Sequence, residues 1–153
     1  MSSTISQDTM LLAMYNQGKA DALDLRSRAA DMTGTEIIDE ESKVPAFDGE
    51  KDYSEWAVGS PVADEDQVWT LIQPYNASHY PDTRPSTLRA LWGLCHTKDP
   101  LKAKPWVDPF GTSGMYMKDE CYKAEDGTVY RAKQDNLVYN AVALPDMWEI
   151  VQE

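Results

Sequence analysis

The chain has 153 residues, of which 42% are hydrophobic, so it is long enough to bury a core and too apolar for a disordered polymer. Its 26 acidic residues outnumber its 14 basic residues and give a formal net charge of −12. Duplex DNA and anionic membrane surfaces select basic patches, so we expect neither nucleic acid nor a membrane as a partner.

The segment 1–44 contains no proline and no tryptophan, and it predicts a helical arm. Ser6 or Asp8 is the expected N-terminal cap of its helix, and Gly34 is the expected end. The first ten residues lack the basic start and apolar run of a secretion signal. We therefore expect the chain to fold in a bacterial host cytoplasm.

Seven residues of the arm recur at alternating spacings of four and three, which is a heptad pattern: Leu11, Tyr15, Gly18, Ala22, Leu25, Ala29 and Met32. These are the candidate oligomerisation residues. A period of 3.5 residues suits packing against another helix. Two interpretations stay open, because the helix can lie on its own domain or associate with its own copies or a helical partner.

A second, short helix is predicted after the arm. Thr33 and Glu36 have the spacing of a capping box, and the next residues, Ile37 and Ile38, supply an apolar face. Pro45 ends this helical part of the chain.

Beyond Pro45, short aromatic and β-branched runs alternate with turn residues, as in small antiparallel β units. The clearest hairpin spans 120–132 and turns at Asp126-Gly127, a pair that favours the backbone twist of a tight hairpin. An earlier stretch, 60–71, has the same layout around an acidic turn.

The two hairpins belong to an internal duplication, because ordered matches recur 56 to 61 positions apart: Trp56 with Tyr116, Val62 with Tyr122, Trp69 with Tyr130, Asn76 with Asn136 and Trp92 with Trp148. We expect the repeated aromatic residues to fill small cores. The predicted fold class is mostly β with an N-terminal α-helical arm and two small tandem antiparallel β modules. The predicted domains are the arm 1–44, a first repeat 45–97, and a Pro-rich connector with a second repeat 98–153.

The repeated unit resembles the small chitin-binding carbohydrate-binding modules of families five and twelve. The resemblance rests in the second copy on Tyr116, Asp119, Tyr122, Gly127, Tyr130-Arg131-Ala132 and Trp148, and in the first on Trp56, Gly59, Val62, Trp69-Thr70-Leu71 and Trp92. The segment 105–111 is similar to the lead-in of such modules in bacteriophage proteins. The whole layout resembles accessory proteins of phage and prophage tail-gene regions.

This resemblance implies sugar binding, but the exposed tryptophan pair of the chitin-binding members is absent. Its places hold Gln134-Asp135 in the second copy and Gln73-Pro74 in the first, which cannot stack on a sugar. Loop aromatic residues and neighbouring amides remain, since flat rings stack on sugar C–H faces and amides bind hydroxyls. The candidate carbohydrate-binding residues are Tyr75, Asn76, Tyr80, Asn136 and Tyr139.

The sequence shows no catalytic constellation, and we expect no enzyme activity, metal or cofactor. His79 and His96 lie in no metal-binding helix motif, and Cys95 and Cys121 fit no zinc pattern. Folding in a cytoplasm favours free thiols, although a disulfide between the two copies stays open.

Two functional hypotheses follow from the sequence. The first is a non-enzymatic, tail-associated virion protein whose modules bind a bacterial surface polysaccharide during host attachment. The second is a purely structural component of the particle, in which the modules pack on neighbouring virion proteins and the helical arm oligomerises.

Overall fold

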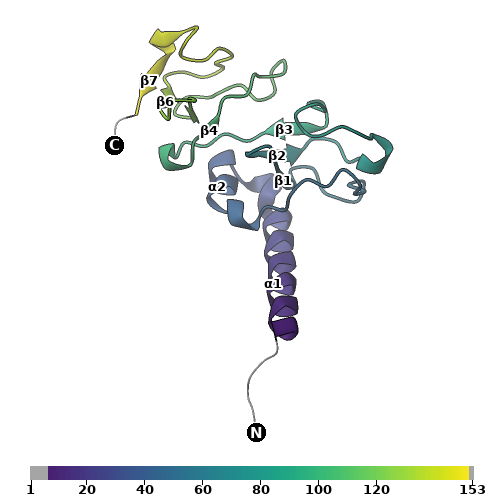
Figure 1. Cartoon of the computed structure of the whole chain (residues 1–153). Coiled ribbons are helices and arrows are strands. Elements are labelled where there is room, and N and C mark those ends of the chain that lie inside the picture. The colour runs from purple at the N-terminus through teal and green to yellow at the C-terminus, as the bar shows by residue number, and fades with distance from the viewer. Residues whose placement is uncertain (1–6, 152–153) are drawn as a thin grey trace.

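A long N-terminal helix precedes two small β-sheets in the computed structural model, which describes residues 7–151 (Figure 1). This arrangement confirms the predicted fold class. The helices are α1 (Gln7–Arg28) and α2 (Gly34–Asp39), with short 3₁₀ turns η1 (Ala29–Asp31), η2 (Glu41–Lys43), η3 (Ala77–His79), η4 (Pro100–Lys102) and η5 (Pro145–Met147). The strands are β1 (Pro61–Asp64), β2 (Gln67–Leu71), β3 (Trp92–Leu94), β4 (Lys104–Pro105), β5 (Cys121–Lys123), β6 (Val129–Ala132) and β7 (Trp148–Ile150).

The first sheet has the strand order β1-β2-β3 and the second has the order β4-β5-β6-β7. All neighbouring strands are antiparallel except β4 and β5, which are parallel. Both predicted hairpins are confirmed. Glu65 and Asp66 turn the first with positive φ angles, and Gly127 does so in the second with φ 89°.

The predicted capping box is confirmed, but the expected role of Gly34 is wrong. Thr33 accepts a hydrogen bond from the Glu36 backbone N–H at 3.2 Å, and the Glu36 carboxylate accepts one from the Thr33 N–H at 2.9 Å. Gly34 therefore opens α2 rather than ending α1, which stops at Arg28. A Cβ atom at Gly34 would lie 2.4 Å from the carbonyl oxygen of His96, so close packing selects glycine here. Of the two expected caps of α1, Asp8 lies inside the helix and so does not cap it, and Ser6 lies outside the described residues.

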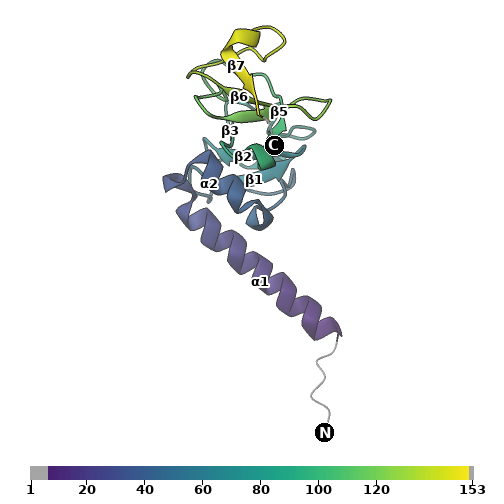
Figure 2. The ribbon, with the colours of Figure 1, turned by 90° about the vertical axis from the view of Figure 1, so that its left-hand side faces the viewer.

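Only the base of α1 packs against the rest of the protein. Leu25 is fully buried, and the Arg26 guanidinium lies 4.1 Å from the centre of the Trp56 ring. Arg28 forms an ion pair with Glu40 just beyond α2, and hydrogen bonds from Arg28 and then Lys43 lower the pKa of Glu40 to about 2. The remainder of the helix projects away from both sheets (Figures 1 and 2). Within residues 7–151, no helix has the length and apolar character needed to cross a bilayer.

The two sheets follow one plan. The same cross-strand pairs recur, with Val62–Trp69 corresponding to Tyr122–Tyr130 and Leu71–Trp92 corresponding to Ala132–Trp148. The turn before each hairpin also matches, since Gly59 and Asp119 both have a positive φ and both donate a backbone N–H across to the second hairpin strand. This agreement in register and hydrogen bonding supports an internal duplication.

Two pairs in the predicted alignment need correction. Tyr53 rather than Trp56 is the structural equivalent of Tyr116. Asn76 does not match Asn136, because Asn76 follows the residue that pairs with Tyr53, whereas Asn136 precedes the residue that pairs with Tyr116. Tyr53 stacks on Phe47 at 5.9 Å, and Tyr116 stacks on Trp106 at 4.9 Å, both with ring planes 9° apart. The first unit carries three extra residues between this tyrosine and the following turn. Equal sequence spacing therefore pointed to Trp56, which packs against α1 instead.

Aromatic side chains fill the core of each unit. Trp69, Trp92, Tyr116 and Trp148 are at most 3% exposed, as the sequence predicted, whereas Trp56 and Tyr130 are half-buried. A third apolar cluster joins α2 to the first sheet, through Ile37, Ile38, Val68 and Cys95. The helical segment after α1 is thus part of the first unit's core.

Direct hydrogen bonds also connect the two units. Thr97 pairs with Cys121 in an isolated antiparallel bridge that leads from the first sheet to the second. The Gln67 side chain donates to the carbonyl of Pro105 at 2.9 Å, and Arg89 donates to the carbonyl of Asp108 at 2.8 Å. The second sheet therefore sits on the side of the first that faces away from α1 (Figure 2).

Candidate functional site

The predicted carbohydrate-binding residues of the first unit are mostly engaged in holding its loops. Tyr75 is only 8% exposed, and its hydroxyl accepts a 2.8 Å hydrogen bond from the Trp92 indole. Asn76 caps η3 by accepting hydrogen bonds from the backbone and hydroxyl of Ser78. Tyr80 is 47% exposed and contacts the edge of the Tyr75 ring. The Tyr75 ring is therefore closed to a ligand.

The predicted residues of the second unit belong to another loop, and within residues 7–151 no hydrogen bond or ring contact joins them to those of the first. Asn136 has a φ of 63°, so it serves as a left-handed turn residue. Tyr139 is 59% exposed, and its backbone carbonyl accepts a hydrogen bond from the Trp148 indole at 2.9 Å. Asn136 and Tyr139 thus shape the loop that closes over the second core.

A groove of about 860 Å³ lies beside the second hairpin. Four segments line it, namely the β1–β2 turn, the connector around β4, the β5–β6 hairpin and the loop before η5. The side chains that they contribute include Asp66, Trp106, Tyr122, Glu125, Tyr130 and Asn140. The groove falls within the volume range of small-ligand sites. It brings aromatic rings and polar side chains together, which the predicted residues do not.

Three aromatic rings form one wall of this groove. Tyr122 is buried, contacts Trp106 edge-on at 5.1 Å and stacks on Tyr130 at 5.3 Å with the planes 22° apart. The Tyr122 hydroxyl accepts a hydrogen bond from the Ala141 N–H at 2.9 Å, and burial raises the pKa of Tyr122. Packing thus fixes the rings of Trp106 and Tyr130, which are half-buried and leave part of their surface accessible.

Polar groups lie around the aromatic wall. The Asn140 side-chain oxygen accepts hydrogen bonds from two backbone N–H groups, which fixes the amide, and its nitrogen has no partner among residues 7–151. Asp126 accepts a hydrogen bond from the Thr128 N–H, and this bond lowers the pKa of Asp126. Asp66 and Glu125 add carboxylates, and Lys123 is the one cation that residues 7–151 contribute to the lining. The groove is therefore acidic and rich in hydrogen-bond acceptors.

Sequence reasoning missed this groove because Tyr130 belongs to the repeated motif and was expected in the core, while Trp106 was assigned only to the lead-in segment 105–111. The available signal was the acidic turn Glu125-Asp126 next to an aromatic strand. Asp66 and Asn140 are far apart in sequence, so no local pattern reveals that they line the same groove.

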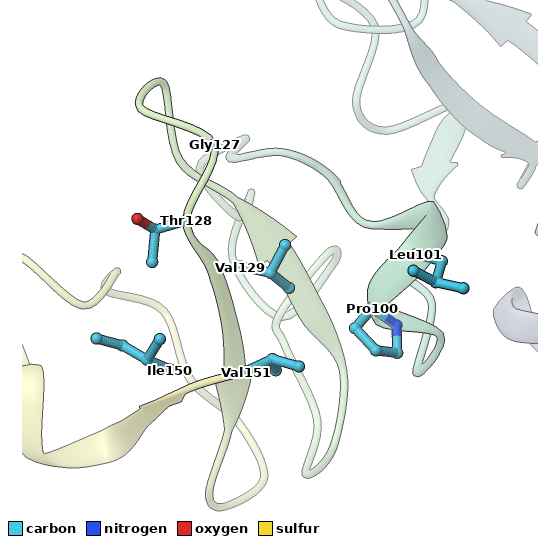
Figure 3. Close-up of a pocket in the computed structure, with 7 residues that line it drawn as sticks. All are labelled: Pro100, Leu101, Gly127, Thr128, Val129, Ile150 and Val151. Carbon is cyan, nitrogen blue, oxygen red and sulfur yellow. The ribbon is translucent and has the colours of Figure 1, made fainter. Parts of the chain in front are cut away.

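A second hollow, of about 700 Å³, lies between η4 and the strands β6 and β7 (Figure 3). Its lining is largely aliphatic, with Leu101, Val129, Ile150 and Val151, and Thr128 supplies the one side-chain hydroxyl. Among residues 7–151 no charged side chain lines it, so these residues supply few directed polar groups to orient a sugar.

The seven predicted oligomerisation residues divide into two groups. Leu11 and Tyr15 are 63% and 61% exposed, and Gly18 is also exposed. Ala22 and Met32 are half-buried, whereas Leu25 and Ala29 are buried in the protein's own core. The helix thus lies on its own domain at its base and remains uncovered beyond it.

Both cysteines and one of the two histidines, His96, are buried. Burial raises the pKa of the Cys95 thiol to about 12 and also raises that of Cys121; the two thiols are unpaired. His96 is 8% exposed and hydrogen-bonds the carbonyl of Gly114. Among residues 7–151, no group of three or more His, Cys, Asp or Glu side chains is placed to hold a metal ion.

No protein-family model matches the chain, and no curated protein is significantly similar to it.

Proposed function

We propose that this protein is a non-enzymatic, virion-associated protein of bacteriophage type that binds a host-surface glycan through the groove beside its second hairpin. The observation that carries the proposal is the meeting of the accessible Tyr130 and Trp106 rings with the carboxylates and the free Asn140 amide nitrogen. Aromatic rings stack on the C–H faces of sugars, while carboxylates and amides hydrogen-bond the hydroxyls.

The charge of the groove narrows the class of glycan. Among residues 7–151, the groove lining holds three carboxylates, of Asp66, Glu125 and Asp126, and one lysine. The whole chain carries a net charge of −12. Anionic polymers would be repelled, because like charges that are brought together in a binding site are unfavourable. The expected ligand is therefore a neutral or amino-sugar polysaccharide, which agrees with the resemblance to chitin-binding modules.

Pull-down of the full chain on insoluble neutral polysaccharides, chitin included, tests this proposal, with an anionic polysaccharide as the negative control. Tyr130→Leu should weaken binding about tenfold by removing a stacking ring. Tyr139→Leu is the matched control, because Tyr139 is 59% exposed and lies outside the groove lining. The groove assignment is wrong if Tyr139→Leu loses binding and Tyr130→Leu keeps it.

The virion part of the proposal rests on the resemblance of residues 45–153 to modules in phage tail-region proteins. An antibody against the chain should detect it in purified particles from the host that carries its gene. Absence from such particles, with the protein present in the lysate, would contradict this part of the proposal.

A purely structural role in the particle is the second candidate. Leu101 and Val142 are 81% and 90% exposed on the surface of the second unit, and such side chains suit packing on a neighbouring protein. Under this alternative the protein is present in particles, no polysaccharide binds, and Tyr130→Leu has no effect on incorporation.

A further inference from the structure

The N-terminal half of α1 exposes large apolar side chains that no other part of residues 7–151 covers. Every residue from Thr9 to Ala20 is exposed, and the helix stands clear of both sheets in two perpendicular views (Figures 1 and 2). The exposed fractions of its large apolar side chains lie between 52% and 67%, for Met10, Leu11, Leu12, Met14 and Tyr15. A contiguous group of this kind on a soluble protein marks an interaction surface.

Four of these side chains continue a stripe that is already used for packing. At 100° per residue, Met10, Leu11, Met14 and Tyr15 fall on the same side of the helix as Leu25. Leu25 is fully buried at the base, so the protein's own fold covers one end of the stripe. The spacing of four and three along the stripe is that of helix–helix packing, so the open end suits a second helix.

The charge distribution favours another copy of the same helix as the occupant. Residues 9–18 contain no ionisable side chain other than Tyr15, although the whole chain carries a charge of −12. Two such neutral segments can pack together without burying an unpaired charge. A strongly charged partner helix would find no complementary charge on this face.

The projection of α1 also reduces the electrostatic repulsion between two associating copies, whose β units form acidic bodies. Met10 lies 15 residues before the buried Leu25, which places it about 22 Å along the helix from the base. The Debye length at physiological salt is about 8 Å, so charges that are held apart by this distance are largely screened. An antiparallel contact through the tips of two α1 helices therefore avoids the electrostatic cost of a direct contact between the bodies.

We propose that the N-terminal half of α1 is a self-association surface, on which the same segment of another copy packs through Met10, Leu11, Met14 and Tyr15. An isolated helix of this length is marginal in water, so association also stabilises the helix itself. The inference does not depend on glycan binding. Where both hold, an oligomer would present several grooves and raise the avidity for a repetitive polymer.

Light scattering after size exclusion on the full chain tests this, at about 100 µM protein, where a dissociation constant on the order of 1 µM gives mostly oligomer. The test variant is Leu11→Gln with Met14→Gln, since both side chains are exposed and glutamine is a good helix former. The matched control is Leu101→Gln with Val142→Gln, which removes two even more exposed apolar side chains from the second unit. The native chain and the control should have the mass of an oligomer, and the α1 variant that of a monomer.

Circular dichroism supplies a second measurement. The helical signal of the native chain should fall on dilution, whereas that of the α1 variant should be low and independent of concentration, with the melting of the β units unchanged in both. A native chain that is monomeric at the higher concentration, or an α1 variant that keeps the native oligomer mass, overturns the proposal. If the native chain is monomeric, the surface on α1 binds a different protein instead of a second copy. This reading does not depend on whether the groove binds a glycan.

Discussion

The imidazole ring of His96 stacks on the phenol ring of Tyr116, with ring centroids 3.6 Å apart and planes 21° apart. His96 follows the last strand of the first sheet, and Tyr116 lies in the core of the second unit. The ring nitrogen Nε2 of His96 donates a hydrogen bond of 2.8 Å to the carbonyl oxygen of Gly114. The pair therefore joins the two β units through a buried contact.

This contact predicts that stability falls as the pH is lowered from 6.5 towards 4. Burial, with a smaller contribution from nearby Arg89, lowers the pKa of His96 from 6.5 to about 4. Between these values the unfolded chain takes up a proton that the folded protein does not, so protonation favours unfolding. The loss of unfolding free energy at pH 4 should be on the order of 3 kcal/mol relative to pH 7.

His96→Gln isolates this effect, because glutamine can donate to the same carbonyl and does not titrate. Urea denaturation of both proteins at pH 7, 6, 5 and 4 gives the difference in stability at each pH. That difference should shift in favour of the variant as the pH falls. A constant difference across the range would show that His96 is protonated equally in the folded and unfolded states.

A second prediction concerns the hydrogen bond between Tyr75 and Trp92. Tyr75→Phe removes the acceptor of the buried Trp92 indole N–H, and an unsatisfied buried donor costs about 1–3 kcal/mol. Tyr80→Phe is the control, because Tyr80 is 47% exposed and should change stability by no more than about 0.5 kcal/mol. Chemical denaturation measures both, and equal effects would contradict the assigned role of the Tyr75 hydroxyl.

Local signals in the sequence predicted much of the fold. The capping box at Thr33 and Glu36 and the turn at Asp126-Gly127 each depend on a few neighbouring residues, and both form as expected. The prediction that Trp56 is the first aromatic residue of the repeat was wrong, because sequence spacing alone cannot show an insertion. Tyr53 and Trp56 lie three residues apart, and only the contacts of the ring decide which belongs to the repeat.

The candidate site was less accessible to sequence reasoning, because burial depends on contacts between distant segments. The residues around Tyr75 predict an exposed loop. However, Tyr75 is buried, and its hydroxyl accepts a hydrogen bond from Trp92, 17 positions later. The groove likewise is lined by Asp66, Tyr130 and Asn140, of which the first and last are 74 positions apart in the chain. In a single sequence, residue type and local pattern carry no information on such contacts between distant segments.

Two glycines give opposite predictions for the same substitution. At Gly34 an added Cβ would lie 2.4 Å from the backbone oxygen of His96, so Gly34→Ala should lower the free energy of unfolding by about 1–3 kcal/mol. At Gly18, apart from the backbone of its own helix turn, no atom of residues 7–151 lies within 4 Å of an added Cβ, and alanine is favoured over glycine inside a helix by about 1 kcal/mol. Gly18→Ala should therefore increase the helical circular dichroism signal. Unchanged thermal stability in Gly34→Ala would mean that α2 can shift away from His96 without cost.

The base of α1 supplies the last prediction, through two leucines that are two residues apart. Leu25 is fully buried, whereas Leu23 is 58% exposed on another side of the same helix. Leu25→Ala should therefore cost about 2–5 kcal/mol of unfolding free energy, because it leaves a cavity where α1 meets the first unit. Leu23→Ala should stay within about 0.5 kcal/mol of the native protein. Urea denaturation followed by tryptophan fluorescence measures both, and Trp56, which contacts Arg26 in the same region, reports on the first unit. Equal stability of the two variants would show that the base of α1 is not part of the cooperative fold.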